Sequence, residues 1–261
     1  MSVSERAFSF EPALIQDLIG AKRILFITGA GISAESGLPT YRGVGGLYED
    51  VDTPDDLPIE TILSGPMFQR RPDLTWRYML QLEEACRGAS YNRAHEAIAR
   101  FQEHFEVVVL AQNVHGFHGD AGSQNVIEIH GNLRRIQCIR CSFCEQVPNY
   151  AHLQGPTPRC QVCGDVLRPA VVLFGEMLPP DAVDRMVTEL ERGFDLIFSV
   201  GTSALFPYIA EPVWLAAEHG IPTVEINPVA TDLSSAVRYR ISAQAGDALQ
   251  RLWRAWQSQA S

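Results

Sequence analysis

Short apolar runs alternate with helical patterns along this chain. The run at 22–28 is closed by a glycine, and similar runs follow at 106–111, 126–130, 171–174, 195–200 and 222–226. Helical patterns lie between or after these runs, at 92–103, 182–193, 208–220 and 245–256. Continuous apolar runs are typical of strands that are buried on both faces. The alternation therefore predicts an α/β fold, a Rossmann-like parallel sheet with helices on both faces.

Two stretches interrupt this alternation, and we interpret them as insertions that form a smaller module. Residues 43–90 begin rich in glycine, proline and aspartate and become helix-like, whereas 134–170 hold five of the six cysteines. We expect a dinucleotide-binding domain made of three segments and a smaller domain with a helical part and a cysteine-rich part. The segments of the larger domain are 1–42, 91–133 and 171–261, and the parts of the smaller one are 43–90 and 134–170.

Composition and charge narrow the functional classes. Hydrophobic residues make up 46% and charged residues 20% of the 261 residues, as in folded proteins with a full core. The net charge of −10 argues against binding nucleic acid through bulk positive charge. No stretch approaches the roughly 20 apolar residues of a membrane span, and the N-terminus lacks a secretory pattern. We therefore expect a cytoplasmic protein with neither a membrane nor a nucleic acid as partner.

The clustered cysteines predict a structural zinc site. Cys138 and Cys141 form one Cys-x2-Cys pair, and Cys160 and Cys163 form another after eighteen intervening residues. Each such pair offers two thiolates from one tight turn, and four thiolates leave zinc no open position for catalysis. Cys144 follows Cys141 at the same spacing, so spacing alone leaves two ligand sets open.

A glycine-rich turn follows the first predicted strand. The run Gly29-Ala30-Gly31-Ile32-Ser33-Ala34 fits the G-x-G-x-x-G/A pattern of dinucleotide-binding turns. Its first glycine would allow the tight turn, and its second would let the backbone approach a pyrophosphate. An ordinary strand–helix turn that uses glycines is equally compatible. No acidic residue ends a second strand about 20 positions on, so the pattern indicates a nucleotide without fixing its orientation.

Several motifs together resemble those of the sirtuins, the NAD-dependent protein deacylases. The longer run from Gly29 to Gly43 looks like the sirtuin signature, and the cysteine pairs match as well. Further matching motifs follow in the same order as in that family: Gln112-Asn113, His130-Gly131, Phe174-Gly175-Glu176, Gly201-Thr202-Ser203 and Glu225-Ile226-Asn227. The resemblance covers roughly residues 22–250.

The resemblance implies that NAD is a co-substrate and that His130 is a catalytic base. In sirtuins the acyl-lysine carbonyl oxygen attacks the ribose carbon that bears nicotinamide, and a histidine then helps a ribose hydroxyl to attack. An imidazole suits that proton transfer because its pKa lies near neutrality. The expected products are nicotinamide, free lysine and O-acyl-ADP-ribose.

The same resemblance assigns the remaining site residues. Asn113 is expected to join His130 in catalysis, and Cys138 to be a zinc ligand, which leaves Cys144 as a spare thiol. The walls of the acyl-lysine tunnel and the backbone that pairs with the substrate peptide are expected at Val172, Phe174, Gly175 and Glu176. The expected cofactor-binding residues are Gly29, Ala30, Gly31, Ser33, Ala34, Tyr41, Arg42, Gln112, Asn113, His115, Gly201, Thr202, Ser203, Asn227 and Ala245.

Position 115 departs from the family pattern. Sirtuins usually carry an aspartate there that receives the carboxamide of nicotinamide, whereas this chain has His115. A neutral imidazole accepts a hydrogen bond in only one tautomer, and a protonated one accepts none. We therefore expect weaker or more pH-dependent cofactor cleavage. The alternative is that an asparagine and backbone groups carry the recognition and that His115 is tolerated.

The acyl-binding region also departs from one sirtuin group. Sirtuins that favour succinyl or malonyl lysine carry a Tyr-x-x-Arg pair, and the best match here places Met79 and Leu82 at those positions. Arg77 is expected on another side of the helix. Because an apolar pocket cannot balance a buried carboxylate, we expect neutral acyl groups, with acetyl favoured over succinyl.

Two other functional classes stay open at this stage. The altered residue at position 115 is compatible with an ADP-ribosyltransferase or NAD hydrolase of the same fold. A non-catalytic NAD-binding sensor is a third possibility, but a pure binder has no use for a base such as His130.

Overall fold

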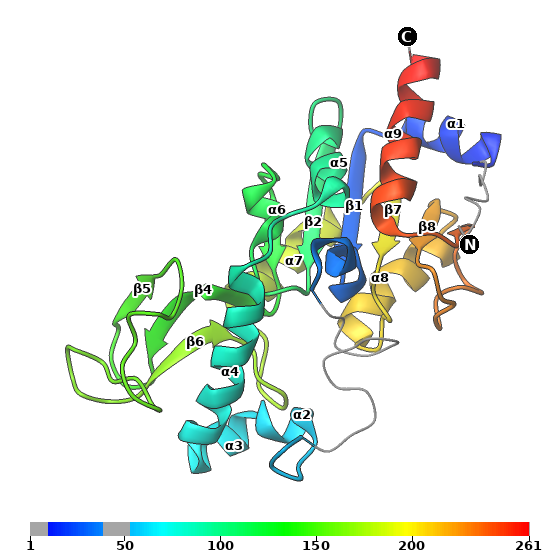
Figure 1. The fold of residues 1–261 in the computed structure, drawn as a ribbon. Helices are drawn as coiled ribbons and strands as arrows, with labels where there is room; N and C mark the ends of the chain where they lie inside the picture. Colours follow the sequence, from blue (N-terminus) through cyan, green and yellow to red (C-terminus); the bar gives the residue numbers. More distant parts are fainter. Residues whose placement is uncertain (1–9, 39–52, 261) are drawn as a thin grey trace.

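A parallel sheet forms the larger part of the molecule (Figure 1). The computed structural model describes residues 10–38 and 53–260. The sheet has six strands in the order β3-β2-β1-β7-β8-β9, and every neighbouring pair is parallel. Its strands are β1 (Arg23–Thr28), β2 (Glu106–Ala111), β3 (Val126–Glu128), β7 (Leu196–Val200), β8 (Thr223–Ile226) and β9 (Tyr239–Ile241). The predicted α/β fold is thereby confirmed.

Each face of this sheet has its own hydrophobic core. Successive side chains of a strand point to opposite faces, so Ile24 and Phe26 of β1 pack on one side and Leu25 and Ile27 on the other. The first side is covered by α1 (Pro12–Gly20), α5 (Arg93–Phe101) and α9 (Ala245–Ala260). The second side is covered by α7 (Pro180–Glu191) and α8 (Pro207–Glu218).

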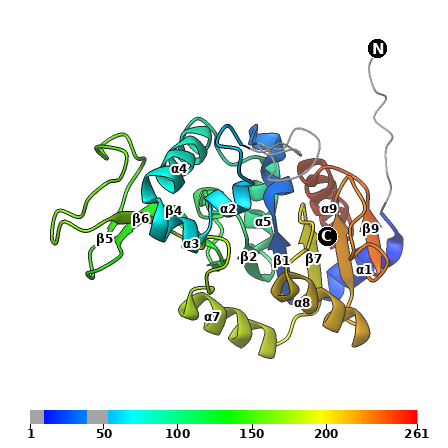
Figure 2. The same ribbon diagram turned by 90° about the horizontal axis from the view of Figure 1, so that it is seen from below.

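A smaller module lies to one side of the sheet in both ribbon views (Figures 1 and 2). It combines helices with a three-stranded antiparallel sheet in the order β5-β4-β6. Trp76, fully buried in its core, donates a hydrogen bond from Nε1 to the Leu167 carbonyl over 2.8 Å. The elements are α2 (Ile59–Ile62), α3 (Gly65–Arg70), α4 (Pro72–Arg87), β4 (Gly131–Cys138), β5 (Cys144–Gln146) and β6 (Leu167–Val171).

One predicted strand lies elsewhere. The run at 171–174 was expected to be a strand of the parallel sheet, and this prediction is wrong. The corresponding strand, β6, ends at Val171 and pairs with β4 in the small sheet. The run is apolar because Leu173 is buried in the core of the small module. The pattern of apolar residues alone cannot show which of the two cores a segment joins.

The chain continues from β1 into a 3-10 helix, which is wound more tightly than an α-helix. Residues Ala30–Ser36 form a 3-10 helix, η1, that ends at Gly37 with a φ of 78°. A glycine accommodates this left-handed conformation without the clash of a Cβ. Nowhere in 10–38 and 53–260 is there a helix long and apolar enough to cross a lipid bilayer.

Candidate active site

The candidate site lies where the parallel strands end. Because the carboxyl ends of parallel strands meet at one edge of a sheet, side chains that follow them are brought together. Gly29 directly follows β1, Gln112 follows β2, Gly201 follows β7 and Asn227 follows β8. His130 lies two residues after β3 and directly before β4 of the small module.

The two glycines of the first turn are required by close packing. A Cβ on Gly31 would lie 2.8 Å from the Cα and carbonyl oxygen of Gly201, and one on Gly29 would lie 2.7 Å from Cβ of Thr202. The backbone N–H of Gly31 donates to the Gly201 carbonyl over 2.8 Å. The expected reason for the second glycine was access of a pyrophosphate, but contact between two strand-end loops is sufficient to require it.

Gln112 and Asn113 tie these loops together. Nε2 of Gln112 donates to the Thr28 carbonyl over 3.1 Å and to Oγ1 of Thr202 over 2.8 Å. Nδ2 of Asn113 donates to the Gly29 carbonyl over 2.9 Å. The two amides thus join the ends of β1, β2 and β7 at one point of the edge.

Asn227 continues the same network on the far side of β7. Its Nδ2 donates to the Thr202 carbonyl over 3.1 Å, and Oγ1 of Thr202 accepts the Ala204 N–H over 3.0 Å. Ser203, between these residues, is exposed. The loop after β7 is therefore held by Gln112 on one side and Asn227 on the other, while Ser203 is exposed.

The hydrogen-bond partners of His130 indicate its tautomer. Its Nδ1 lies 2.9 Å from the Gln112 carbonyl, which can only accept, so Nδ1 carries the proton. The other nitrogen, Nε2, therefore holds the free electron pair. Burial lowers the pKa of His130, which keeps the ring uncharged near neutral pH, although the bond to Gln112 opposes this shift. A residue in this state can take a proton through Nε2.

His115 is also neutral, but both of its nitrogens are occupied. Nδ1 accepts the backbone N–H of Phe117 over 3.2 Å, so the proton is on Nε2, which lies 2.8 Å from Oγ of Ser33. Burial lowers the pKa of His115 to about 3, and His95 and Arg134 act in the same direction. In this arrangement His115 has no acceptor left for a carboxamide.

His95 lies against His115, with ring centroids 6.1 Å apart, and His118 lies against His95; sequence reasoning gave neither residue a role. The ring centroids of His95 and His118 are 4.9 Å apart, and both side chains are buried. Nε2 of His118 lies 2.9 Å from Oγ1 of Thr28, whereas Nδ1 of His118 and Nε2 of His95 have no hydrogen-bond partner among the described residues. Burial lowers the pKa of both histidines, that of His95 to about 4.

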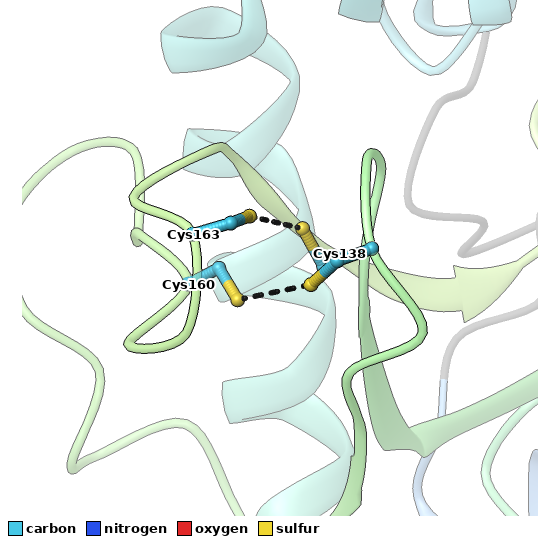
Figure 3. A group of neighbouring side chains, drawn as sticks. Cys138, Cys160 and Cys163 are labelled. Carbon is cyan, nitrogen blue, oxygen red and sulfur yellow. Dashed lines mark hydrogen bonds between the residues drawn. The ribbon is translucent and has the colours of Figure 1, made fainter.

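The four predicted zinc ligands form one cluster. The Sγ atoms of Cys138, Cys141, Cys160 and Cys163 all lie within 4.8 Å of one another. Figure 3 shows Cys138, Cys160 and Cys163 pointing toward a common centre. The Sγ–Sγ distance is 3.4 Å between Cys138 and Cys163 and 3.7 Å between Cys141 and Cys160, too long for disulfides. Both distances are close to the roughly 3.8 Å between two sulfurs of a tetrahedral four-thiolate zinc site. The donor set therefore fits structural zinc, and exposed Cys144 lies outside the cluster.

The predicted substrate-binding segment joins the two modules. The N–H of Val172 donates to the His130 carbonyl, and the N–H of Phe174 donates to the Leu63 carbonyl, both over 2.9 Å. The carboxylate of Glu176 binds Arg168 through two hydrogen bonds of 2.7 Å. The segment is therefore anchored beside His130, with Gly175 at a positive φ of 79° in its turn.

Three further cofactor-binding residues were predicted, at positions 41, 42 and 245. Tyr41 and Arg42 lie outside the described residues. Ala245 is buried at the start of α9, and the N–H of the next residue, Gly246, donates to the Glu35 carboxylate over 2.6 Å. The start of α9 therefore lies against η1, the turn that follows β1.

Tyr208 is the residue of this site that sequence reasoning missed. The prediction placed it at the start of a helix, and it does lie in the first turn of α8. Its hydroxyl lies 2.6 Å from Nε2 of His130. Its position shortly after the Gly201-Thr202-Ser203 motif, at the edge where the parallel strands end, was the available signal.

Comparison with known proteins agrees with this architecture. The sequence model of the Sir2 family matches residues 29–206. A Pseudomonas aeruginosa protein named NAD-dependent protein deacylase 2 is 51% identical over 236 residues, which are 89% of this chain and 91% of that protein.

Two solved structures are similar over nearly the whole chain. A mutant Sir2 homologue in complex with 2'-O-acetyl ADP ribose has a TM-score of 0.87 and 34% identity, and the match covers 97% of this chain and 98% of that one. A Sir2 complex with a p53 peptide and NAD+ has a TM-score of 0.78 and 26% identity over 95% and 98% of the two chains.

The fold and the strand-end site define an α/β protein of the dinucleotide-binding class with an inserted cysteine-rich module. Within this class, the chain belongs to the Sir2 family.

Proposed function

We propose that this Sir2-family enzyme is an NAD-dependent protein lysine deacylase that releases nicotinamide and O-acyl-ADP-ribose. The observation that carries the proposal is the state of His130, neutral with its free electron pair on Nε2, at the edge where the parallel strands end. The name of the Pseudomonas aeruginosa relative supports the same activity. The substrates of the present enzyme would be acyl-lysine side chains of proteins or peptides.

The residues of this chain would serve the reaction in two stages. First, the acyl carbonyl oxygen attacks the ribose carbon, and the bond from that carbon to nicotinamide breaks. Asn113, whose Nδ2 donates to the Gly29 carbonyl, would stand beside this step. A ribose hydroxyl then attacks the acyl carbon, and its proton passes to Nε2 of His130, which the Gln112 carbonyl orients through Nδ1. Water completes the hydrolysis.

The other predicted roles are carried forward as proposals. The loops at Gly29–Ala34 and Gly201–Ser203, with Asn227, would hold the phosphates and the adenosine of NAD. The segment from Val172 to Glu176 would bind acyl-lysine and its peptide. Zinc at the four-cysteine cluster would stabilise the small module and take no part in the chemistry.

The surroundings of α4 favour neutral acyl groups. Met79 and Leu82 are buried in the core of the small module. Arg77 is half exposed and binds the Asp55 carboxylate over 3.0 Å, so this charge is already balanced. A succinyl carboxylate at the positions of Met79 and Leu82 would lose its hydration without gaining a cation.

Product analysis tests the proposed activity. We would incubate the purified protein with NAD and an acetylated peptide and identify the products by mass spectrometry. O-acetyl-ADP-ribose is expected from the natural chain and absent from His130→Gln, whereas His219→Gln, at an exposed residue, should behave as the natural chain. ADP-ribosylated protein, free ADP-ribose alone or unchanged NAD would each contradict the proposal.

A further inference from the structure

The lone pair on Nε2 of His130 already accepts a hydrogen bond from Tyr208. Because Nδ1 donates to the Gln112 carbonyl, Nε2 can only accept, and the hydroxyl of Tyr208 donates to it over 2.6 Å. Burial raises the pKa of Tyr208 to about 12, so its hydroxyl keeps its proton near neutral pH. The pair is therefore a neutral donor and a neutral acceptor in a short hydrogen bond.

Neighbouring rings fix the position of Tyr208. Its ring stacks on Phe206, with centroids 5.4 Å apart and an angle of 16° between the planes. Both rings meet His130 edge-on, Tyr208 at 90° and Phe206 at 77°. Pro207 begins α8 between them. The hydroxyl is thus held against Nε2 by its own ring, by Phe206 and by the first turn of a helix.

This arrangement limits how a ribose hydroxyl can reach the base. An imidazole nitrogen has one electron pair, so Nε2 cannot accept from Tyr208 and from a ribose hydroxyl at the same time. A phenolic oxygen that donates its hydrogen can still accept another hydrogen bond. The ribose hydroxyl can therefore donate to Oη of Tyr208 without any movement of the base.

We propose that Tyr208 is a proton relay between the ribose hydroxyl and His130, an inference that rests on the proposed deacylase function. As the ribose oxygen attacks the acyl carbon, its O–H bond breaks and its proton forms a new O–H bond on Tyr208. The original hydroxyl proton of Tyr208 passes to Nε2 of His130. Tyr208 is neutral before and after the step, and His130 becomes an imidazolium.

The relay makes a prediction that a structural role does not. Cleavage of the bond to nicotinamide comes before the proton transfer, so exchange of labelled nicotinamide into NAD requires no base, whereas deacylation does. In Tyr208→Phe we expect exchange within about twofold of the natural enzyme, a KM for NAD within about threefold, and a deacylation kcat that is at least about tenfold lower.

A matched variant controls for loss of a buried hydroxyl. Tyr239 lies on β9, and its hydroxyl donates to Asp17 far from His130. Tyr239→Phe should leave the ratio of deacylation to exchange unchanged. Unchanged deacylation in Tyr208→Phe would overturn the relay. So would faster deacylation or a lower KM for NAD, because either would identify Tyr208 as a cap that the cofactor displaces.

A measurement on the natural enzyme covers the case in which Tyr208→Phe does not fold. Deacylation rates in mixtures of H2O and D2O should depend quadratically on the deuterium fraction when two protons move in one transition state. A linear dependence, or equal loss of exchange and deacylation in a folded Tyr208→Phe, contradicts the relay. If the natural enzyme forms no O-acyl-ADP-ribose, the proposed function itself has failed, and this outcome is separate from failure of the relay.

Discussion

Nε2 of His115 donates a hydrogen bond to Oγ of Ser33 over 2.8 Å, in a tautomer fixed by the Phe117 N–H at Nδ1. Burial lowers the pKa of His115 to about 3, so its charge does not change between pH 6 and 8. The structure therefore argues against the pH dependence that the sequence led us to expect from this residue. Weaker cofactor cleavage remains the prediction.

His115→Asp should increase cofactor cleavage. An aspartate can accept from the Phe117 N–H and still offer an oxygen to the carboxamide of nicotinamide. One such hydrogen bond is worth about 0.5–1.5 kcal/mol, which corresponds to roughly a two- to tenfold gain in kcat/KM for NAD. Steady-state kinetics of both enzymes from pH 6 to 8 measure the effect, and identical values would show that His115 is merely tolerated.

The buried histidines should make stability depend on pH. The pKa values of His95, His115 and His118 are all lowered by burial, to about 4 for His95 and about 3 for His115. Above the pKa of about 6.5 that a histidine has in the unfolded chain, neither the folded nor the unfolded protein binds these protons, so the histidines do not lower the free energy of unfolding. As the pH falls below about 6.5, the histidines are protonated in the unfolded chain but not in the folded one. Each histidine then lowers the free energy of unfolding by about 1.4 kcal/mol for every unit of pH decrease, until the pH reaches its pKa in the folded state.

Urea unfolding at several pH values between 7.5 and 5 measures this slope. His95→Asn should reduce the slope, because it removes one of the three histidines whose pKa burial lowers. A free energy of unfolding that stays constant from pH 7.5 to 5 would refute the prediction.

The cysteine cluster predicts which thiols hold metal. Cys160→Ser should lose bound zinc and lower the melting temperature, because a structural zinc site contributes directly to folding. Cys144→Ser is the matched control, since Cys144 is exposed and lies outside the cluster. Elemental analysis should give one zinc per chain for the natural protein and for Cys144→Ser. Retained zinc in Cys160→Ser would exclude the proposed ligand set.

Acyl preference can be measured on one peptide with three modifications. We expect kcat/KM for acetyl-lysine to exceed that for succinyl-lysine by at least about tenfold, because Met79 and Leu82 are apolar and buried and Arg77 of the same helix already pairs with Asp55. Butyryl-lysine, which is neutral and similar in length to succinyl-lysine, separates the effect of size from that of charge. A preference for succinyl-lysine would contradict the proposed neutral pocket.

The glycine of the strand-end contact should not tolerate a side chain. Gly31→Ala would place a Cβ 2.8 Å from the Gly201 backbone, and overpacking of this kind costs about 1–3 kcal/mol. We expect a lower melting temperature and weaker NAD binding. Gly88→Ala is the control, because no atom lies within 4 Å of its Cβ position and its φ is −88°. Equal behaviour of the two variants would contradict this explanation.

Much of the fold could be predicted because its signals are local. The buried strand at 106–111 matches β2 residue for residue, and the cysteine spacing selected the ligands that cluster. The strand expected at 171–174 was misplaced, since apolar character does not reveal which core a segment joins. Strand β9 has three residues and too little periodicity to be recognised.

The site was predictable in its residue types but not in its hydrogen bonds. Gln112, Asn113 and His130 were named from motifs, and the structure joins Gln112 to His130 directly. The contact between His130 and Tyr208 spans 78 residues and depends on where α8, which packs against β7 and β8, begins. The tautomer of His115 likewise depends on the backbone path to Phe117, which composition and spacing do not specify.

Strand β4 begins at the residue after His130 and ends at Cys138. The four-cysteine cluster and His130 are therefore joined by a single strand, whose first residue, Gly131, lies opposite Val171 of β6 and whose pairing with β6 shifts register between Asn132 and Ile136. Under the proposed zinc assignment, removal of the metal should lower activity as well as stability, because disorder at Cys138 would spread along β4 to His130. Oxidation of these thiols should lower activity in the same way, although none of them lies among the residues that follow the parallel strands.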